Sequence, residues 1–153
     1  MREKASILIV DDDVDICKTL SLILEGCKVD VANSGMEAIK KSKKKAYSVA
    51  LLDIVLPDMT GTELLKKLQM ITPKMVKIMV TGYPNLQNAV EALNYNADAY
   101  LMKPVDYEKL LEVIKEKLEK QMEEENLTVE KIAAFVKART QKLLQKMVEE
   151  TGE

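Results

Sequence analysis

Five short runs of apolar residues recur along the chain, and each is followed by a segment with the spacing of an amphipathic helix. The runs lie at residues 5–10, 27–32, 47–52, 75–80 and 97–102. Short strands that alternate with helices are typical of βαβ units, whose right-handed crossovers build a parallel sheet with helices on both faces. The alternation therefore predicts an α/β domain with a doubly wound, five-stranded parallel sheet.

The third run indicates where a functional site lies. Residues 49–52 are apolar without alternation, as in a strand buried on both faces, and the run ends at Asp53. Residues 57–61 then form a turn, where Thr60 or Thr62 can cap the next helix. Ligands bind at the C-terminal edge of such sheets. The position of Asp53 therefore favours a functional role over a role as an ordinary acidic residue of a loop.

Polar residues also follow three of the other runs, and the topology brings these strand ends together. Asp11 and Asp12 follow the first run, Thr81 the fourth and Lys103 the fifth. Three crowded carboxylates repel one another, which raises the pKa of at least one unless a cation is bound, and Mg²⁺ suits carboxylate ligands. A lysine and a hydroxyl beside them suit a phosphoryl group, and an aspartate can itself be the nucleophile.

Composition narrows the possible chemistry. None of the 153 residues is histidine, which excludes histidine bases and ligands, so any metal must be held by oxygen. The net charge of −2 gives no bulk electrostatic case for binding nucleic acid or membranes. Cys17 and Cys27 form no CxxC motif and indicate a reducing compartment. The first apolar run is too short for a signal peptide or membrane span, so we expect a cytoplasmic protein.

Two of the predicted helices carry apolar residues that we expect to face the sheet. In the helix before the fifth run, these are Leu86, Ala89, Val90 and Leu93. In the helix after it, which Asp106 caps, they are Leu110, Leu111, Ile114, Leu118 and Met122.

The last part of the chain reads as an appendage. Residues 121–128 are polar and contain helix stop and start signals, so we predict a linker there and a further helix at 129–148. This divides the chain into a domain at 1–122 and a helical extension at 123–153 without a recognisable output domain. Residues 128–148 are basic and the helix before them is acidic, so the two could pair. Docking on the domain, fraying in solvent, dimerisation and partner binding all remain open for the extension.

One alternative function follows from the acids after the first run. Asp11, Asp13 and Asp15 are similar to the start of the motif of haloacid-dehalogenase-type phosphatases, although Asp15 stands where that motif has Thr or Val. A small phosphatase with an aspartate nucleophile is therefore the alternative.

Four motifs together resemble those of a receiver domain. They are ILIVDDD at 7–13, LLDIVLPDMTG at 51–61, MVTGYP at 79–84 and ADAYLMKPVD at 97–106. In this order, each at a strand end, they resemble the CheY-like response-regulator receiver domain of two-component signalling, over residues 4–122. The resemblance implies a flavodoxin-like (βα)5 three-layer sandwich with strand order 2-1-3-4-5.

The resemblance also implies a phosphoacceptor and a metal site. Asp53 would be the phosphoacceptor. Asp12 and Asp53 would bind Mg²⁺ together with the backbone carbonyl of Val55, and Asp11 would help through water.

Further roles are implied around the phosphate. Lys103 would contact the phosphoryl oxygens, and Thr81 would swing toward the phosphate while Tyr100 moves inward. The bond before Pro104 would be cis. The side chains two residues after Asp53 and after Thr81 would flank the approach of the hydrolytic water.

Those flanking side chains are Val55 and Tyr83, which predicts slow loss of the phosphate. The implied function is phosphoryl transfer from a sensor histidine kinase or phosphotransfer protein, which switches a surface for an unknown downstream protein. We expect no enzymatic activity beyond self-phosphorylation and autodephosphorylation and no direct contact with nucleic acid. A homodimer through the last helices is one option for the oligomeric state, which the sequence leaves open.

Overall fold

A computed structural model describes residues 5–151 of the chain, apart from the side chains of residues 127 and 128. The chain divides into two compact units, Met1–Leu118 and Glu119–Glu153. The first unit contains the sheet, and the second consists of the greater part of the last helix.

Strands and helices alternate through the first unit. The strands are β1 (Ser6–Val10), β2 (Lys28–Ala32), β3 (Val49–Leu52), β4 (Val76–Thr81) and β5 (Ala99–Met102). The helices are α1 (Val14–Ile23), α2 (Gly35–Lys44), α3 (Gly61–Ile71), α4 (Leu86–Asn94) and α5 (Tyr107–Thr151).

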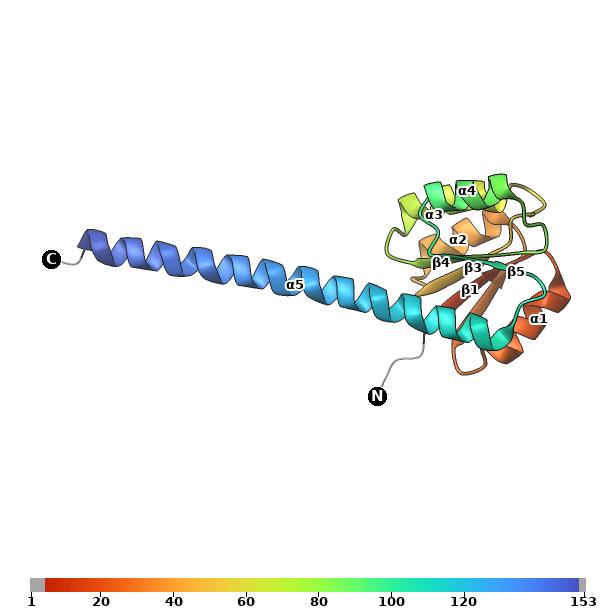
Figure 1. Ribbon diagram of the computed structural model, residues 1–153, viewed down its shortest axis with the longest axis horizontal. Helices are drawn as coiled ribbons and strands as arrows, with labels where there is room; N and C mark the ends of the chain where they lie inside the picture. The colour runs from red at the N-terminus through yellow and green to blue at the C-terminus, as the bar shows by residue number, and fades with distance from the viewer. Residues whose placement is uncertain (1–4, 152–153) are drawn as a thin grey trace. The chain divides into compact units, whose positions relative to one another are not determined.

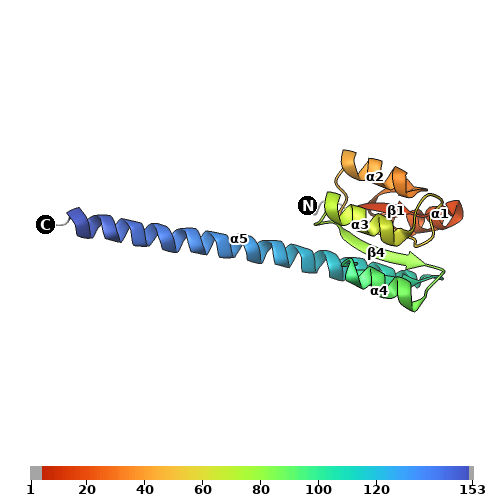
Figure 2. The same cartoon turned by 90° about the horizontal axis from the view of Figure 1, so that it is seen from above.

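The sheet confirms the predicted topology. Its order is β2-β1-β3-β4-β5, and every neighbouring pair is parallel. Helices α2, α3 and α4 cover one face, while α1 and the start of α5 cover the other (Figure 1). Seen from above, α2, α3 and α4 follow one another across their face (Figure 2). This is the three-layer flavodoxin-like arrangement.

Each face of the sheet has its own apolar core, because successive strand residues point to opposite faces. Leu8, Ala50 and Met79 belong to the core beneath α2, α3 and α4. Ile9 and Leu51 belong to the core beneath α1 and α5. Burial on both faces explains why the central strands read as unbroken apolar runs.

A charged residue lies within one of these runs. Lys77 of β4 is fully buried, and its ammonium donates hydrogen bonds to the Gln69 Oε1 atom at 2.7 Å, to the Met75 carbonyl at 3.0 Å and to the Thr72 carbonyl. Lys77 therefore supplies donors to a side chain in the last turn of α3 and to two carbonyls at the end of the helix and in the loop after it. Burial lowers the pKa of Lys77 to about 8.

The predicted inward face of α4 is wrong. Leu86 and Leu93 are 81% and 71% exposed and Val90 is also exposed, while Ala92 is the buried residue of this helix. The reason lies in the neighbouring strand, since β5 is at the edge of the sheet and none of its residues is fully buried. The edge offers little apolar surface, so α4 leaves much of its apolar side uncovered.

The apolar face of α5 was only partly predicted. Leu110 and Ile114 are buried against the sheet, and Leu118 packs at the margin of the same core. Leu111 and Met122 are exposed, contrary to the prediction.

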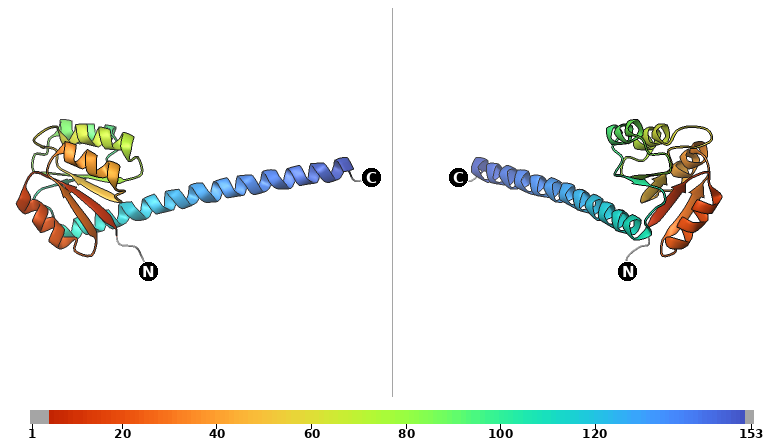
Figure 3. Two further views of the ribbon diagram at one scale, coloured as in Figure 1. Left: turned by 180° about the vertical axis from the view of Figure 1, so that it is seen from behind. Right: turned by 45° about the vertical axis from the view of Figure 1, so that its right-hand side comes forward.

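The predicted linker at 121–128 is also wrong, because α5 is one helix of 45 residues (Figure 3). The helix contains no glycine or proline, and asparagine costs less than about 0.7 kcal/mol relative to alanine in a helix interior. Weak stop signals among glutamates therefore do not end it. Among the described residues, no helix combines the length and apolarity that crossing a membrane requires.

Replacing Lys77 by methionine should destabilise the protein. The variant loses donors for three acceptors, an effect we expect to lower the free energy of unfolding by about 1–3 kcal/mol. Chemical denaturation at pH 7 checks this. Lys74→Met, in the exposed loop before β4, is the matched control and should stay within about 0.5 kcal/mol of wild type.

The same pair of proteins tests the pKa of Lys77. Because this pKa is lowered on folding, the unfolded chain holds more protons between pH 8 and the ordinary lysine value of 10.5. The stability of wild type relative to Lys77→Met should therefore rise with pH across this window. A difference that stays flat or falls would contradict a lowered pKa.

Candidate functional site

The strand register brings two aspartates to one edge of the sheet. Val10 of β1 lies opposite Leu52 of β3, so the residues that follow, Asp11 and Asp53, come side by side. The Asp53 amide donates to the Val10 carbonyl at 3.0 Å. Both aspartates are buried, with 4% and 5% of their surface exposed.

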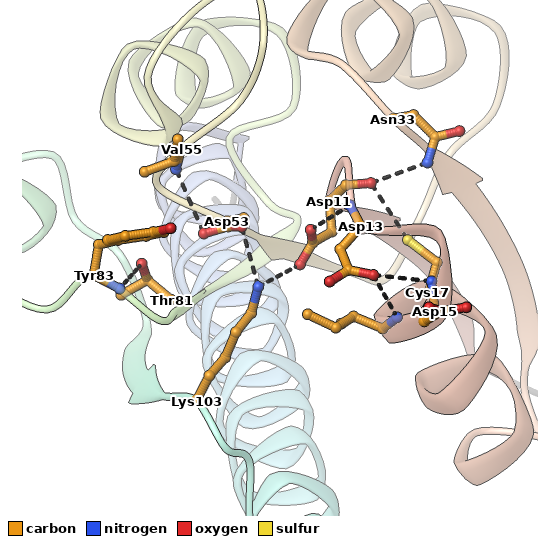
Figure 4. A network of polar contacts seen from close by, with 11 residues as sticks. Asp11, Asp13, Asp15, Cys17, Asn33, Asp53, Val55, Thr81, Tyr83 and Lys103 are labelled. Atoms are coloured by element: carbon orange, nitrogen blue, oxygen red, sulfur yellow. Dashed lines mark hydrogen bonds and ion pairs between the residues drawn. The ribbon is translucent and has the colours of Figure 1, made fainter.

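Lys103 joins these two carboxylates. Its Nζ atom lies 2.6 Å from the Asp11 Oδ2 atom and 3.1 Å from the Asp53 Oδ2 atom. Figure 4 shows the lysine reaching in from the end of β5 to lie between them. The bond that follows it, Lys103–Pro104, is cis. The site thus combines residues from the ends of three strands.

Burial and charge act together on these groups. Burial raises the pKa of Asp11, the hydrogen bond from Lys103 lowers it, and the nearby charge of Asp53 adds to the rise. Burial lowers the pKa of Lys103, but its bonds to both carboxylates outweigh this and leave the pKa raised. One carboxylate in the cluster therefore has a raised pKa, as predicted, but burial contributes more to the rise than repulsion.

Asp12 completes a set of three acids. Among the described residues, one carboxylate oxygen from each of Asp11, Asp12 and Asp53 lies within 4.8 Å of the others. Asp12 is exposed, so a cation held there would face solvent. The donor set fits Mg²⁺, which binds few carboxylates and keeps several waters.

The predicted Val55 ligand lies next to this set. The Val55 amide is 3.4 Å from the Asp53 Oδ1 atom, and Val55 forms an isolated bridge with Thr60. The role of its carbonyl in metal binding stays a prediction.

The two residues with predicted switch roles lie on neighbouring strands, Thr81 at the end of β4 and Tyr100 within β5. Thr81 is fully buried, and its Oγ1 atom accepts a hydrogen bond from the Tyr83 amide at 3.0 Å. The hydroxyl oxygen of Tyr100 is already buried. Burial raises the pKa of Tyr100, and the Asn85 backbone lowers it in part. Inward movement of Tyr100 on phosphorylation stays a prediction.

Val55 and Tyr83 are the outermost of the predicted site residues. Both side chains are exposed, and Figure 4 shows them on the side of Asp53 away from Asp11. The Tyr83 ring extends toward Asp53 in this view. Their placement fits the predicted flanks of a path for water.

The sequence analysis missed three residues that hold Asp11 in place. The Asp13 amide donates to the Asp11 Oδ1 atom at 2.9 Å, and Asp13 itself caps α1 through the amides of Asp15 and Ile16. Asn33 Nδ2 donates to the Asp11 carbonyl at 3.0 Å. Asp13 was visible as a third acid after β1, but no sequence signal connected Asn33 with this site.

The third of these residues is Cys17, whose thiol donates to the Asp11 carbonyl at 3.4 Å. Burial raises the pKa of this thiol to about 11, and the negative charge of Asp11 adds to the rise. Cys17 is therefore a protonated, buried side chain with a structural contact to the site.

Gly61 was recognised only as the end of a turn, yet it touches the backbone of Asp53. Its amide donates to the Ile54 carbonyl at 2.6 Å, and a Cβ atom added to Gly61 would lie 2.0 Å from the Asp53 carbonyl oxygen. The absence of a side chain at this position allows the loop after β3 to close beside the acid.

Comparison with known proteins identifies the family. The family model described as the response regulator receiver domain matches residues 7–115. The transcriptional regulatory protein ZraR of Klebsiella oxytoca is 37% identical over 118 residues, which cover 76% of this chain and 27% of that protein. Response regulator ArlR of Staphylococcus epidermidis is 32% identical over 126 residues, which cover 81% and 57%.

A solved structure agrees with these relatives. The crystal structure of a CheY-like response regulator receiver domain protein from Methanospirillum hungatei JF-1 superimposes with a TM-score of 0.77 at 49% identity. The match covers 80% of this chain and 99% of that one. By contrast, the chain spans only 27% and 57% of the two curated relatives named above.

The fold and the acidic site thus define a phosphoacceptor module of two-component signalling. The chain belongs to the response regulator receiver domain family, and its fold is CheY-like. Receiver domains generally bind Mg²⁺ and interact with histidine kinases or phosphotransfer proteins. The alternative of a haloacid-dehalogenase-type phosphatase is not supported.

Replacing Gly61 by alanine should disturb both stability and the site. The added methyl group meets backbone rather than a flexible side chain, so we expect a loss of about 1–3 kcal/mol in the free energy of unfolding. Denaturation and the chemical shifts of the Asp53 and Ile54 amides check this. At Gly26 an added Cβ meets nothing within 4 Å, so Gly26→Ala is the control. Equal stability and unchanged shifts in Gly61→Ala would contradict the close contact.

Proposed function

We propose that Asp53 is the phosphoacceptor and that a histidine kinase or a phosphotransfer protein is the donor. The observation that carries this is a buried carboxylate at the end of β3 with an ammonium 3.1 Å away. In the transfer, the P–N bond of the donor breaks and its electron pair stays with the imidazole. A P–O bond forms to a carboxylate oxygen of Asp53.

The surrounding residues have distinct tasks in this proposal. Asp12 and Asp53, with the Val55 carbonyl, would hold Mg²⁺, and Asp11 would help through water. The ion would supply positive charge near the phosphoryl oxygens. Lys103, protonated because of its two acidic partners, contributes a fixed positive charge beside the new acyl phosphate.

Thr81 and Tyr100 connect the phosphate to the surface. Before phosphorylation, the Thr81 hydroxyl accepts a hydrogen bond from the Tyr83 amide. When this hydroxyl turns toward the phosphate, the environment of the Tyr83 amide changes. Tyr100 lies on β5, next to β4 in the sheet. The change therefore spreads from the end of β4 to the side of the domain formed by α4 and β5.

That side offers a surface for a downstream protein. Leu86, Val90 and Leu93 of α4 and Met102 of β5 are exposed apolar residues. An apolar surface beside a switch suits a protein partner better than nucleic acid. Regulation in this proposal takes place in the cytoplasm and involves no turnover beyond phosphorylation and dephosphorylation of the chain itself.

The C-terminal extension has a separate role in this proposal. Residues 1–122 carry the phosphoryl chemistry in this proposal, and residues 123–153 are the C-terminal extension, which is helical as far as Thr151. A second copy of this chain is a further proposed partner, and the argument for it rests on the extension.

Acetyl phosphate and Mg²⁺ should add one phosphoryl group to the protein, as measured by intact mass. Asp53→Asn should abolish the adduct, because an amide is not a competent nucleophile, and EDTA should abolish it in wild type. Asp15→Asn, which changes an acid of α1 outside the carboxylate set, is the matched control and should retain the adduct. Full phosphorylation of Asp53→Asn would contradict the assignment.

The phosphorylated form should be long-lived because Val55 offers hydrolytic water no hydrogen bond. An oriented hydrogen bond is worth about 1–3 kcal/mol in the transition state. Val55→Asn should therefore lose phosphate roughly tenfold to a hundredfold faster. The measurement is the decay of the phosphorylated protein after removal of the donor with Mg²⁺ present. Val55→Leu is the apolar control and should decay like wild type. Equal rates for Val55→Asn and wild type would show that this side chain does not limit hydrolysis.

A further inference from the structure

The helix of the second unit, Glu119–Glu153, has an apolar stripe that its own unit does not cover. The stripe contains Met122, Val129, Ile132, Val136 and Leu143, all exposed. Successive members are separated by seven, three, four and seven residues, so they share one side of an α-helix. Large exposed apolar surfaces of this kind mark contacts with another chain.

Charge divides the same helix into two halves. Residues 119–130 contain Glu119, Glu123, Glu124, Glu125 and Glu130 against Lys120. Residues 131–151 contain Lys131, Lys137, Arg139, Lys142 and Lys146, and the only acids there are Glu149 and Glu150 near the end of the helix. One half is therefore strongly acidic and the other strongly basic.

The continuity of α5 decides how this complementarity can be used. With a linker at 121–128, the basic half could fold back on the acidic half of the same chain. Because the helix runs unbroken to Thr151, its two halves cannot lie side by side within one chain. A second copy of the helix can bring the acidic and basic halves together.

We propose that the second unit pairs with the same unit of a second copy of this chain, with the two helices antiparallel. Packed helices lie about 8–10 Å apart, comparable to the Debye length of about 8 Å at physiological salt. The antiparallel arrangement places the acidic half of each helix beside the basic half of the other. The parallel arrangement places acidic beside acidic and basic beside basic.

The apolar stripe fits the same arrangement. When Ile132 lies opposite Ala133 of the second copy, Val129 lies opposite Val136 and Met122 lies opposite Leu143, and each contact occurs twice by symmetry. Four of the five members of the stripe therefore meet another member when its direction is reversed, and Ile132 meets the small side chain of Ala133.

One polar layer interrupts this stripe. In the same register Glu125 lies opposite Thr140, which is one residue from Arg139. Polar layers fix the register of helix pairs at some cost in stability. The pairing concerns the second unit and does not depend on phosphoryl transfer.

Disulfide trapping in the full chain tests the direction of the pair. Two variants are made with Cys27 replaced by serine, one carrying Met122→Cys and the other Leu143→Cys, while Cys17 is left because it is buried. After oxidation, the mixture should give the mixed covalent dimer, identified by mass, and neither variant alone should dimerise efficiently. Efficient dimerisation of each variant alone would indicate a parallel pair and overturn the proposal, and so would absence of dimer in the mixture.

Sedimentation of the full chain tests the surface without relying on disulfides. Wild type should dimerise, and Ile132→Glu should weaken the dimer at least about tenfold, which corresponds to about 1.4 kcal/mol. Ala134→Glu adds the same charge two residues along the helix, outside the stripe, and should dimerise like wild type. Circular dichroism confirms that each variant is folded. A monomeric wild type, or a dimer that Ile132→Glu leaves unchanged, would overturn the proposal.

Discussion

The contact of one ammonium with two buried carboxylates is the constraint around which the first unit is built. Lys103 lies 92 residues from Asp11 and 50 residues from Asp53 in sequence, yet its Nζ atom contacts both. Removing carboxylates from water is costly unless a cation compensates. The parallel sheet makes this possible, because β1 and β3 end side by side and β5 ends on the same C-terminal side of the sheet. Gly61, Asp13 and Asn33 then secure the loops that carry the acids.

Much of this arrangement could be predicted from sequence, because it rests on signals that are local and strong. Short unbroken apolar runs favour strands that are covered on both faces. The residues that follow parallel strands then lie at the C-terminal edge of the sheet. Asp53 and Lys103 were found in this way. Capping at Thr60 and Asp106 was equally visible, since these side chains satisfy amides a few residues away.

What could not be predicted depends on surfaces that meet only in three dimensions. Periodicity showed that α4 has an apolar side, but not that an edge strand would leave Leu86 and Leu93 exposed. Lys77 interrupts an apolar run, and only the fold reveals the carbonyls that accept hydrogen bonds from its ammonium. The linker was inferred from weak stop signals, which a long helix without glycine or proline tolerates. Because α5 is unbroken, its acidic and basic halves cannot fold onto each other within one chain, which favours contact between two chains.

The most direct test of the account is chemical trapping of the phosphorylated residue. Borohydride reduces an aspartyl phosphate to homoserine, so treatment of the phosphorylated wild-type protein followed by peptide sequencing by mass spectrometry locates the acceptor. The account predicts homoserine at position 53 and intact aspartates at 11 and 12. Homoserine at either of those two positions, or a phosphate that borohydride does not remove, would contradict it.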